Sequence, residues 1–505
     1  MNTNNSNLLK IFSNYLGKIW NMLSVFLFVP MYIHYLGIES YAVIAFYSLI
    51  LGVIGFADAG MSSATIREFA LVKPTSYKEF ILSKIERFYW LVVLIISTII
   101  AIFSGFIAKN WLQNDSIPLG DLRNYVILIG IGTSLQLLSS LYFGSMFGLG
   151  KQVQANFLQI IWITSRTLLV VLLFILYKKS LYVFFLWQIA CNIIYILLLR
   201  TATKRILKRD ITYLDSFERK FPKRIIKYIS GMVIVALISA INSQADKLVV
   251  SYFFDLKTFG YYTLTSILSQ IPVIIALPMA SFAFPLLSKL SSLDDKNSFN
   301  VTFEKFSYLL YFLVIPIGVG IYFYPLEILL FWTNNGIEKN TYSDIILLIK
   351  TLTIGSVFLA FQVPLFYSLL AYSKTKYTVY QGIFQISLGV PLLLSIAKYH
   401  GLKYIGIPWL IINVLAFLYL MHVCFTRYIN INISKFIIES IAYTTFISIF
   451  LTACGHYLYK KYHLPFLIPL IFTGILIYII NLVLHNIQNN RSPLSLKNLY
   501  NFPRD

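Results

Sequence analysis

Apolar runs of about 20 residues recur along the chain, and short polar turns separate them. A run of that length crosses the roughly 30 Å hydrocarbon core of a bilayer. The pattern therefore predicts an all-α integral membrane protein with about 14 transmembrane helices. We expect the spans near residues 11–33, 41–63, 88–108, 125–147, 157–177, 181–199, 228–252, 259–282, 306–326, 342–372, 377–397, 405–426, 436–458 and 465–485.

The longest polar stretch, residues 200–227, holds ten Lys and Arg residues and divides these spans. Basic loops stay on the cytoplasmic side of a membrane, so this linker and both termini are expected inside the cell. The first turn, residues 34–40, carries no Lys or Arg and is expected outside. The predicted domains are a six-helix bundle over 1–199, the linker over 200–227, a second six-helix bundle over 228–427, and two additional helices with a tail over 428–505.

A weak internal repeat favours the same division. YLGIESYAVI at residues 35–44 and FFDLKTFGYY at 253–262 both run from an aromatic residue through a short polar turn into the next span. Their offset is 253 − 35 = 218 residues. Because six spans separate the two segments, the halves are predicted to be parallel repeats, as in several transporter folds.

Composition narrows the class of protein further. Only 12% of the residues are charged, about half of the roughly 25% found in soluble domains. The net charge of +21 is spread between apolar runs, which favours anionic lipid headgroups over nucleic acid as partners. The three cysteines lie in apolar runs and fit packing, and the first span fits a retained helix rather than a removed signal peptide.

No catalytic motif is found in the sequence. The chain contains no GxxxxGK[ST] phosphate-binding loop, no HExxH and no GxSxG. Its six histidines are scattered, mostly at the predicted span ends. We therefore expect a transporter rather than an enzyme, with no catalytic residue, no metal site and no cofactor.

Four cations fall inside the predicted spans, and they are the first candidates for a substrate site: Lys18, Arg166, Lys247 and Lys350. A charge at the bilayer centre costs at least roughly 2.5–3.5 kcal/mol, so such residues usually face a partner or a wet cavity. The alternatives are that Lys18 extends to the membrane surface and that Lys247 pairs with a neighbour. The clearest intramembrane charges are these four cations and the carboxylates Asp58 and Asp246, and their sum of +2 favours an anionic substrate.

Polar stripes accompany these charges at helical spacing, and we expect them to line the cavity: Asn14, Asn21, Gln159, Asn242, Gln381 and Gln385. The alternative is that they join neighbouring helices by hydrogen bonds. Asp246 and Asp58 are candidates for coupling to a proton or sodium ion. The alternatives are a static pair of Asp246 with Lys247 or Arg166, and a helix end closed by Asp58.

Two motifs resemble those of Wzx-type O-antigen flippases, in the polysaccharide-exporter branch of the multidrug/oligosaccharidyl-lipid/polysaccharide (MOP) superfamily. The first is YLGIESYAVI at 35–44 followed by FADAGMSSATIRE at 56–68, and the second is QADKLVV at 244–250 with GYY at 260–262. Ala42 and Ala57 depart from the usual Gly and Leu. The resemblance implies two six-helix bundles that enclose a cavity, in the bacterial inner (cytoplasmic) membrane.

The resemblance also implies the activity. It would be movement of undecaprenyl-pyrophosphate-linked O-antigen or capsule repeat units to the periplasmic leaflet by alternating access, coupled to an ion gradient. Implied partners are membrane lipids, a polysaccharide polymerase and a chain-length regulator. Alternatives are a lipid II flippase, a multidrug antiporter of the same superfamily, and, as an enzyme, a membrane glycan polymerase or ligase.

Overall fold

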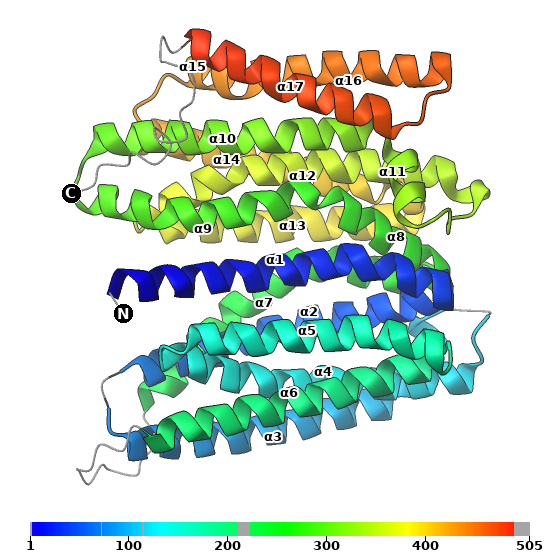
Figure 1. Cartoon of the computed structure of the whole chain (residues 1–505), viewed down its shortest axis with the longest axis vertical. Coiled ribbons are helices and arrows are strands. Elements are labelled where there is room, and N and C mark those ends of the chain that lie inside the picture. Colours follow the sequence, from blue (N-terminus) through cyan, green and yellow to red (C-terminus); the bar gives the residue numbers. More distant parts are fainter. Residues whose placement is uncertain (1–2, 72, 114–115, 210–222, 489–505) are drawn as a thin grey trace. The chain divides into compact units, whose positions relative to one another are not determined.

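A computed structural model describes residues 3–71, 73–113, 116–209 and 223–488 (Figure 1). Every regular element in these ranges is a helix. Residues 210–222 of the basic linker, and the C-terminal tail from residue 489, lie outside the described residues. The expectation of an all-helical membrane protein is confirmed.

The chain divides into two compact units. The first comprises Met1–Leu264, Trp332–Glu338 and Leu393–Leu402, and the second comprises Thr265–Phe331, Lys339–Leu392 and Lys403–Asp505. The helices of the N-terminal part are α1 (Thr3–Leu36), α2 (Ile38–Ala70), α3 (Thr75–Phe106), α4 (Leu119–Gly148), α5 (Gln152–Leu176), α6 (Leu181–Arg209), α7 (Lys223–Phe253) and α8 (Leu256–Ser269). A π-helical turn, η1 (Ile107–Trp111), follows α3.

The remaining helices begin after Gln270. They are α9 (Ile271–Ser292), α10 (Lys296–Phe323), α11 (Pro325–Trp332), α12 (Tyr342–Ala371), α13 (Thr375–Tyr399), α14 (Gly406–Arg427), α15 (Ile433–Ile437), α16 (Tyr443–Tyr462) and α17 (Leu467–Gln488). Three short turns join them: η2 (Lys339–Thr341), η3 (Leu402–Tyr404) and η4 (Ile438–Ala442). Pro316 and Pro364 lie inside α10 and α12 without ending either helix.

Twelve helical segments of the described chain are long and apolar enough to cross a membrane. The two further expected positions correspond to α7, whose side chains are described only from residue 238, and to α17, whose apolar stretch Leu467–Val483 is shorter. The expected span 259–282 is broken at Gln270, between α8 and α9. The chain is therefore a multi-pass membrane protein.

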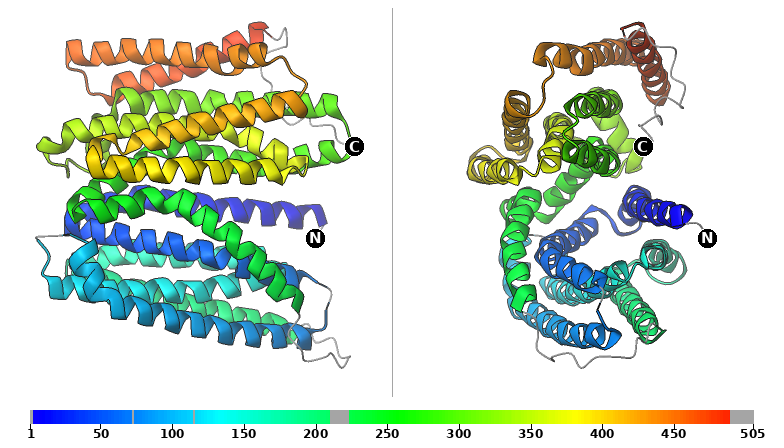
Figure 2. Two further views of the ribbon diagram at one scale, coloured as in Figure 1. Left: turned by 180° about the vertical axis from the view of Figure 1, so that it is seen from behind. Right: turned by 90° about the vertical axis from the view of Figure 1, so that its left-hand side faces the viewer.

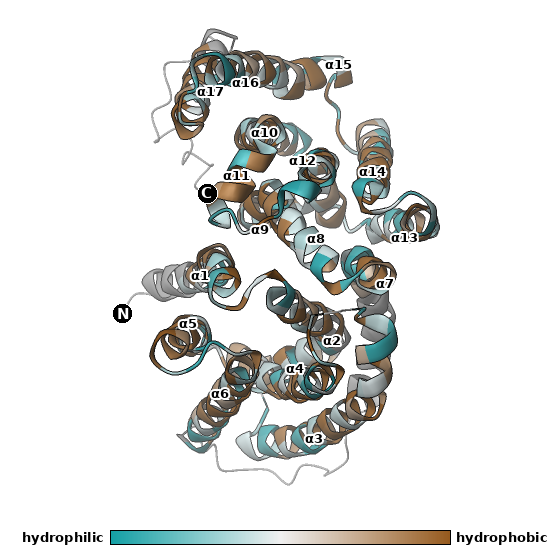
Figure 3. Ribbon diagram, turned by 90° about the vertical axis from the view of Figure 1, so that its right-hand side faces the viewer, coloured by the Kyte–Doolittle hydropathy of each residue, from teal (hydrophilic) through white to brown (hydrophobic). Residues whose placement is uncertain are grey.

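The outward faces of the helices are apolar. On α3, Leu94 is 64% exposed and Ile102 is 72% exposed, which would be costly in water and is favourable against lipid. Much of the ribbon of α6 and α14 is likewise coloured as hydrophobic (Figure 3). Polar side chains that are not at helix ends must therefore be satisfied inside each unit.

The first unit is packed around α4, which contacts α2, α3 and α6. Its core contains fully buried aromatic residues, among them Phe69, Tyr89 and Tyr142. The long, curved α7 packs along α2 (Figure 2). The two segments of the internal repeat, 35–44 and 253–262, contact each other in this unit, where Gly260 lies against Ile38 and Ala42. The division of the chain into bundles at residues 200–227 stays a prediction.

The second unit is packed around α12, which contacts α9, α10 and α14. The backbones of α12 and α14 approach closely, since a Cβ on Gly355 would lie 3.1 Å from the Cα of Leu410. α16 and α17 pack on each other and on α10. The start of α10 is fixed by Asp295, whose side chain accepts a hydrogen bond of 3.0 Å from the backbone N–H of Ser298.

Candidate functional site

A cavity of about 180 Å³ lies in the first unit, between α2, α4, α5 and α6. Polar and aromatic side chains share its wall: Asp58, Thr133, Gln136, Ser139, Ser140, Phe143, Gln159, Trp162 and Tyr195. We call this space the inner cavity. A polar cavity among membrane-spanning helices is unusual enough to be the first candidate for a functional site.

Asp58 is the only carboxylate among the residues that line the inner cavity. Its side chain is 5% exposed, and the hydroxyl groups of Tyr89 and Ser140 each donate a hydrogen bond to one of its oxygens. The Tyr89 bond measures 2.5 Å. The idea that Asp58 closes a helix end is wrong, because α2 continues to Ala70. A buried, doubly hydrogen-bonded carboxylate is well suited to hold a proton or a small cation.

Gln136 adds an unsatisfied acceptor to the same wall. Its Oε1 atom is buried and finds no hydrogen-bond partner among the described residues. Gln136 lies one helical turn before Ser140, so both face the cavity from α4. An acceptor that is buried without a donor is costly, and a ligand that supplies a hydroxyl, an amine or a cation would remove this cost.

Arg166 lies beside the cavity on α5. Its guanidinium Cζ lies 4.7 Å from the centroid of the Trp162 ring, which lines the cavity. Trp162 is stacked on Tyr195 with a centroid distance of 4.7 Å and an interplanar angle of 11°, and it donates a hydrogen bond of 3.1 Å to Asn192. No carboxylate pairs with Arg166 in the described part of the chain. Its positive charge is therefore held by an aromatic ring and remains available to an anion.

The α1 residues have mixed environments. Asn14 accepts a hydrogen bond from the Nδ2 of Asn156 on α5, so it joins two helices. Gln159, on the same face of α5 as Asn156, lines the inner cavity. Lys18 and Asn21 are exposed. The structure thus brings Asp58, Gln159 and Arg166 together around one cavity and does not bring Lys18 or Asn21 into its wall.

Asp246 forms a hydrogen bond with a residue other than Lys247 and Arg166, the two partners expected from the sequence. The hydroxyl of Tyr262 on α8 donates a hydrogen bond of 2.6 Å to its Oδ2 atom. Among the described residues it forms no ion pair with Lys247 or Arg166. Asp246 and Lys247 are both half-buried, as is Asn242 one turn earlier on α7. Gln244, in the same stretch, packs directly on Gly52 of α2.

In the second unit, Lys350 is half-buried on α12, with its Nζ 4.9 Å from the centroid of the Tyr322 ring. Gln381 is buried and donates a hydrogen bond of 2.6 Å to the Oε1 of Gln362. Gln362 in turn donates a hydrogen bond of 3.1 Å to Asn413. This network joins α13, α12 and α14, so Gln381 serves helix packing, while Gln385 is half-buried one turn further on.

The residues of the inner-cavity region that were not expected from the sequence include Tyr89, Gln136, Ser140 and Tyr195. A signal for two of them exists in the fourth span, where Thr133, Gln136 and Ser140 share one helix face at spacings of three and four residues. Single tyrosines and tryptophans carry no such signal in a chain with 17% aromatic residues.

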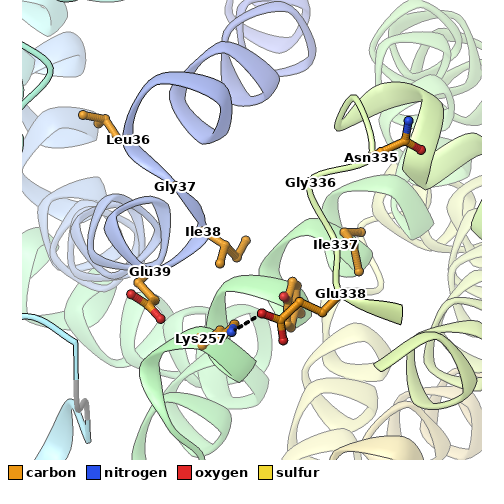
Figure 4. Close-up of a pocket in the computed structure, with 10 residues that line it drawn as sticks. Leu36, Gly37, Ile38, Glu39, Lys257, Asn335, Gly336, Ile337 and Glu338 are labelled. Carbon is orange, nitrogen blue, oxygen red and sulfur yellow. Dashed lines mark hydrogen bonds and ion pairs between the residues drawn. The ribbon is translucent and has the colours of Figure 1, made fainter. Parts of the chain in front are cut away.

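A second, larger hollow of about 390 Å³ also lies in the first unit (Figure 4). It is formed by the turn between α1 and α2, the start of α8 and the segment after α11, and we call it the turn pocket. Lys257 and Glu338 form an ion pair across it, with a distance of 2.6 Å between Nζ and Oε1. The hydrogen bond to Glu338 raises the pKa of Lys257.

Comparison with known proteins identifies the family. Residues 35–334 match the model of a family described as polysaccharide biosynthesis protein. The chain belongs to this family. No curated protein sequence matches the chain significantly.

Solved structures share the fold of this polysaccharide biosynthesis protein. A lipid II flippase, MurJ, in an inward closed conformation is similar at a TM-score of 0.70 and 18% identity, over 96% of this chain and 100% of that chain. An inward-facing multidrug resistance MATE family transporter of the MOP superfamily is similar at a TM-score of 0.63 and 13% identity, over 80% of this chain and 94% of that chain. A MOP superfamily transporter from Pyrococcus furiosus is similar at a TM-score of 0.55 and 14% identity, over 82% of this chain and 95% of that chain. The chain therefore shares the fold of these three transporters.

Proposed function

We propose that this protein is a flippase for lipid-linked oligosaccharides. Its substrate would be an undecaprenyl-pyrophosphate-linked repeat unit of O-antigen or capsule, which it moves from the cytoplasmic to the periplasmic leaflet of the bacterial inner membrane by alternating access. The family match supports a role in polysaccharide biosynthesis, and the MOP fold supports transport. A pyrophosphate with attached sugars cannot cross hydrocarbon unaided, so a protein must supply a polar route.

One observation carries the proposal: the inner cavity combines a buried carboxylate, a stacked aromatic pair and a neighbouring guanidinium. Aromatic faces and amide oxygens suit sugar rings and hydroxyl groups, and a guanidinium suits a phosphate. Helix packing alone does not require this combination of charged, amide and aromatic groups around a cavity. It favours a polar substrate with an anionic group.

The cations would neutralise the pyrophosphate. Arg166 is the strongest candidate, because a planar guanidinium can bind two phosphate oxygens at once. Lys350 is held over Tyr322 in the second unit in a similar manner. Lys18 and Lys247 are the remaining candidates, and the exposure of Lys18 suits a first contact with the headgroup at the membrane surface.

Asp58 is the better candidate for ion coupling. Both of its oxygens accept hydroxyl hydrogen bonds at the wall of a cavity, so loss or gain of a proton or sodium ion would change the cavity's charge. Asp246, bonded to Tyr262, is the second candidate. An ion gradient acting on either carboxylate would drive the transport cycle.

The test is reconstitution of the purified protein in liposomes that contain an undecaprenyl-pyrophosphate-linked oligosaccharide in the outer leaflet. Flipping is measured as the fraction of glycan protected from an external lectin or glycosidase. We expect protection to grow faster than in protein-free liposomes and to respond to an imposed pH or sodium gradient. Equal rates with and without the protein would refute the function.

A lipid II flippase is the second candidate, because the similarity to MurJ extends over 96% of this chain and includes the C-terminal helices. The two substrates share a polyprenyl pyrophosphate and differ in the glycan and the attached peptide. Competition in the same liposomes separates them. Preferential flipping of lipid II over the oligosaccharide substrate would replace our proposal by this one.

A further inference from the structure

The turn pocket is built by three segments that the charge distribution predicts on the outer side of the membrane. They are residues 36–39 between α1 and α2, Lys257 and Tyr261 at the start of α8, and residues 335–338 after α11. At about 390 Å³ the pocket falls in the range of roughly 300–1,000 Å³ typical of small-molecule sites. Its size is sufficient for a sugar ring.

The charges of the pocket come from equivalent positions of the internal repeat. Glu39 and Lys257 are related by the repeat offset, since 39 + 218 = 257, and each is the second residue of its helix. Lys257 forms its ion pair with Glu338 and also interacts electrostatically with Glu39. Two carboxylates and one ammonium group therefore line the same pocket (Figure 4).

Tyr261 contributes a buried hydroxyl group to the wall of the pocket. Its side chain is only 2% exposed, and its hydroxyl lies near the Glu338 backbone but makes no hydrogen bond of normal geometry within the described chain. A buried hydroxyl without a partner is costly, and one that lines a pocket is positioned for a ligand.

The remaining wall combines an amide with apolar side chains. Asn335 has a positive φ of 59°, and the segment that follows it brings Gly336 and Ile337 to the pocket. Leu36 and Ile38 complete the apolar part. Carboxylates, an amide, an ammonium and a phenol beside an aliphatic surface match the hydroxyl groups and the C–H face of a pyranose.

We propose that the turn pocket is a saccharide-binding subsite, which receives a sugar of the translocated glycan on the outer side of the membrane. Glu39 and Glu338 accept hydrogen bonds from sugar hydroxyl groups, and Lys257, Asn335 and Tyr261 donate. A metal cation fits the turn pocket less well than a sugar does, because the ammonium group of Lys257 already pairs with a carboxylate oxygen of Glu338. This inference rests on the proposed flippase function.

The test is binding of the lipid-free repeat-unit oligosaccharide, released from its lipid by mild acid, to the full-length protein in nanodiscs. Saturation-transfer NMR and titration give the affinity of the wild type and of Tyr261→Phe and Glu39→Gln. We expect each substitution to weaken binding about tenfold, because each removes a hydrogen-bonding group from the wall of the pocket. Matched controls are Tyr177→Phe, at the exposed end of α5, and Asp344→Asn, in the first turn of α12, which we expect to bind as the wild type does.

Three results would overturn the subsite. They are no binding by the wild type at millimolar oligosaccharide, equal affinity in wild type and pocket variants, or sodium or calcium binding that the pocket variants lose while no sugar binds. The flipping assay on the same wild-type protein separates the two proposals. If flipping occurs without oligosaccharide binding, only the subsite fails; if no flipping occurs, the flippase function fails.

Discussion

Ala42 and Gly260 lie against each other at the same position of the two repeated segments. A Cβ built on Gly260 would lie 3.2 Å from the Cβ of Ala42 and 3.2 Å from the carbonyl oxygen of Ile38. The offset of the repeat relates the two residues, since 42 + 218 = 260. This contact is compatible with a local two-fold relation between the two segments. Small side chains at both positions allow the first turns of α2 and α8 to approach this closely.

Replacing Gly260 by a large residue should disrupt this contact. We expect Gly260→Leu to destabilise the protein by roughly 1–3 kcal/mol, because extra methylene groups in a packed contact force the backbones apart. The measurement is the thermal unfolding midpoint in detergent, followed by intrinsic fluorescence or by retention of a single size-exclusion peak.

Gly105→Leu is the matched control for this substitution. A Cβ on Gly105, in α3, would have no neighbour within 4 Å. We expect its midpoint to equal that of the wild type. A Gly260→Leu protein as stable as Gly105→Leu would mean that the two turns are not held in close contact.

Replacing Asp58 by Asn tests its role in coupling. The amide keeps the shape, and its oxygen can still accept one of the two hydroxyl hydrogen bonds while its NH₂ group can donate to the other hydroxyl, but it cannot bind or release a proton at neutral pH. We expect Asp58→Asn to fold and to lower the ion-driven flipping rate about tenfold or more, which corresponds to about 1.4 kcal/mol. The measurement compares flipping with and without an imposed gradient.

Two related variants sharpen this prediction. Tyr89→Phe and Ser140→Ala each remove one donor to Asp58 and leave the carboxylate, so we expect smaller decreases and a shifted pH profile of transport. Gradient-driven flipping by Asp58→Asn at the wild-type rate would exclude Asp58 from coupling and leave Asp246 as the candidate.

Replacing Arg166 by Gln should weaken recognition of the anionic headgroup. The half-buried guanidinium is held on Trp162 without a carboxylate partner in the described residues, so its charge is free to act on a phosphate. We expect an apparent affinity for the lipid-linked substrate about tenfold lower, with partial recovery in Arg166→Lys. Arg123→Gln, an exposed residue near the start of α4, removes the same charge as a control. Equal losses in both variants would indicate a non-specific charge effect.

The membrane helices could be predicted from the sequence because hydrocarbon thickness sets the length of an apolar run. The break at Gln270 could not, since the apolar pattern continues through it into α9. Asp58, Gln159 and Arg166 could be predicted as site residues, because charged and amide side chains are rare inside apolar spans. Their convergence around one cavity depends on how α2, α5 and their neighbours pack, which no local pattern encodes. The same limit explains why Gln381 joins Gln362 in a helix contact although a cavity was expected.

Asp295 should make the stability of the protein depend on pH in the acidic range. Hydrogen bonds from the side chain and the backbone N–H of Ser298 hold the pKa of Asp295 below its usual range. A carboxylate with a lowered pKa in the folded state stabilises that state above its unfolded pKa of about 3.9, and this contribution is lost as the pH falls through the folded pKa. Asp295→Ala should therefore unfold at a lower temperature than the wild type at pH 7, and the difference should shrink towards pH 3. Asp295→Asn retains a cap that does not titrate, so its midpoint should fall between the two at pH 7. A difference between Asp295→Ala and wild type that is the same at both pH values would show that the charge of the cap contributes nothing.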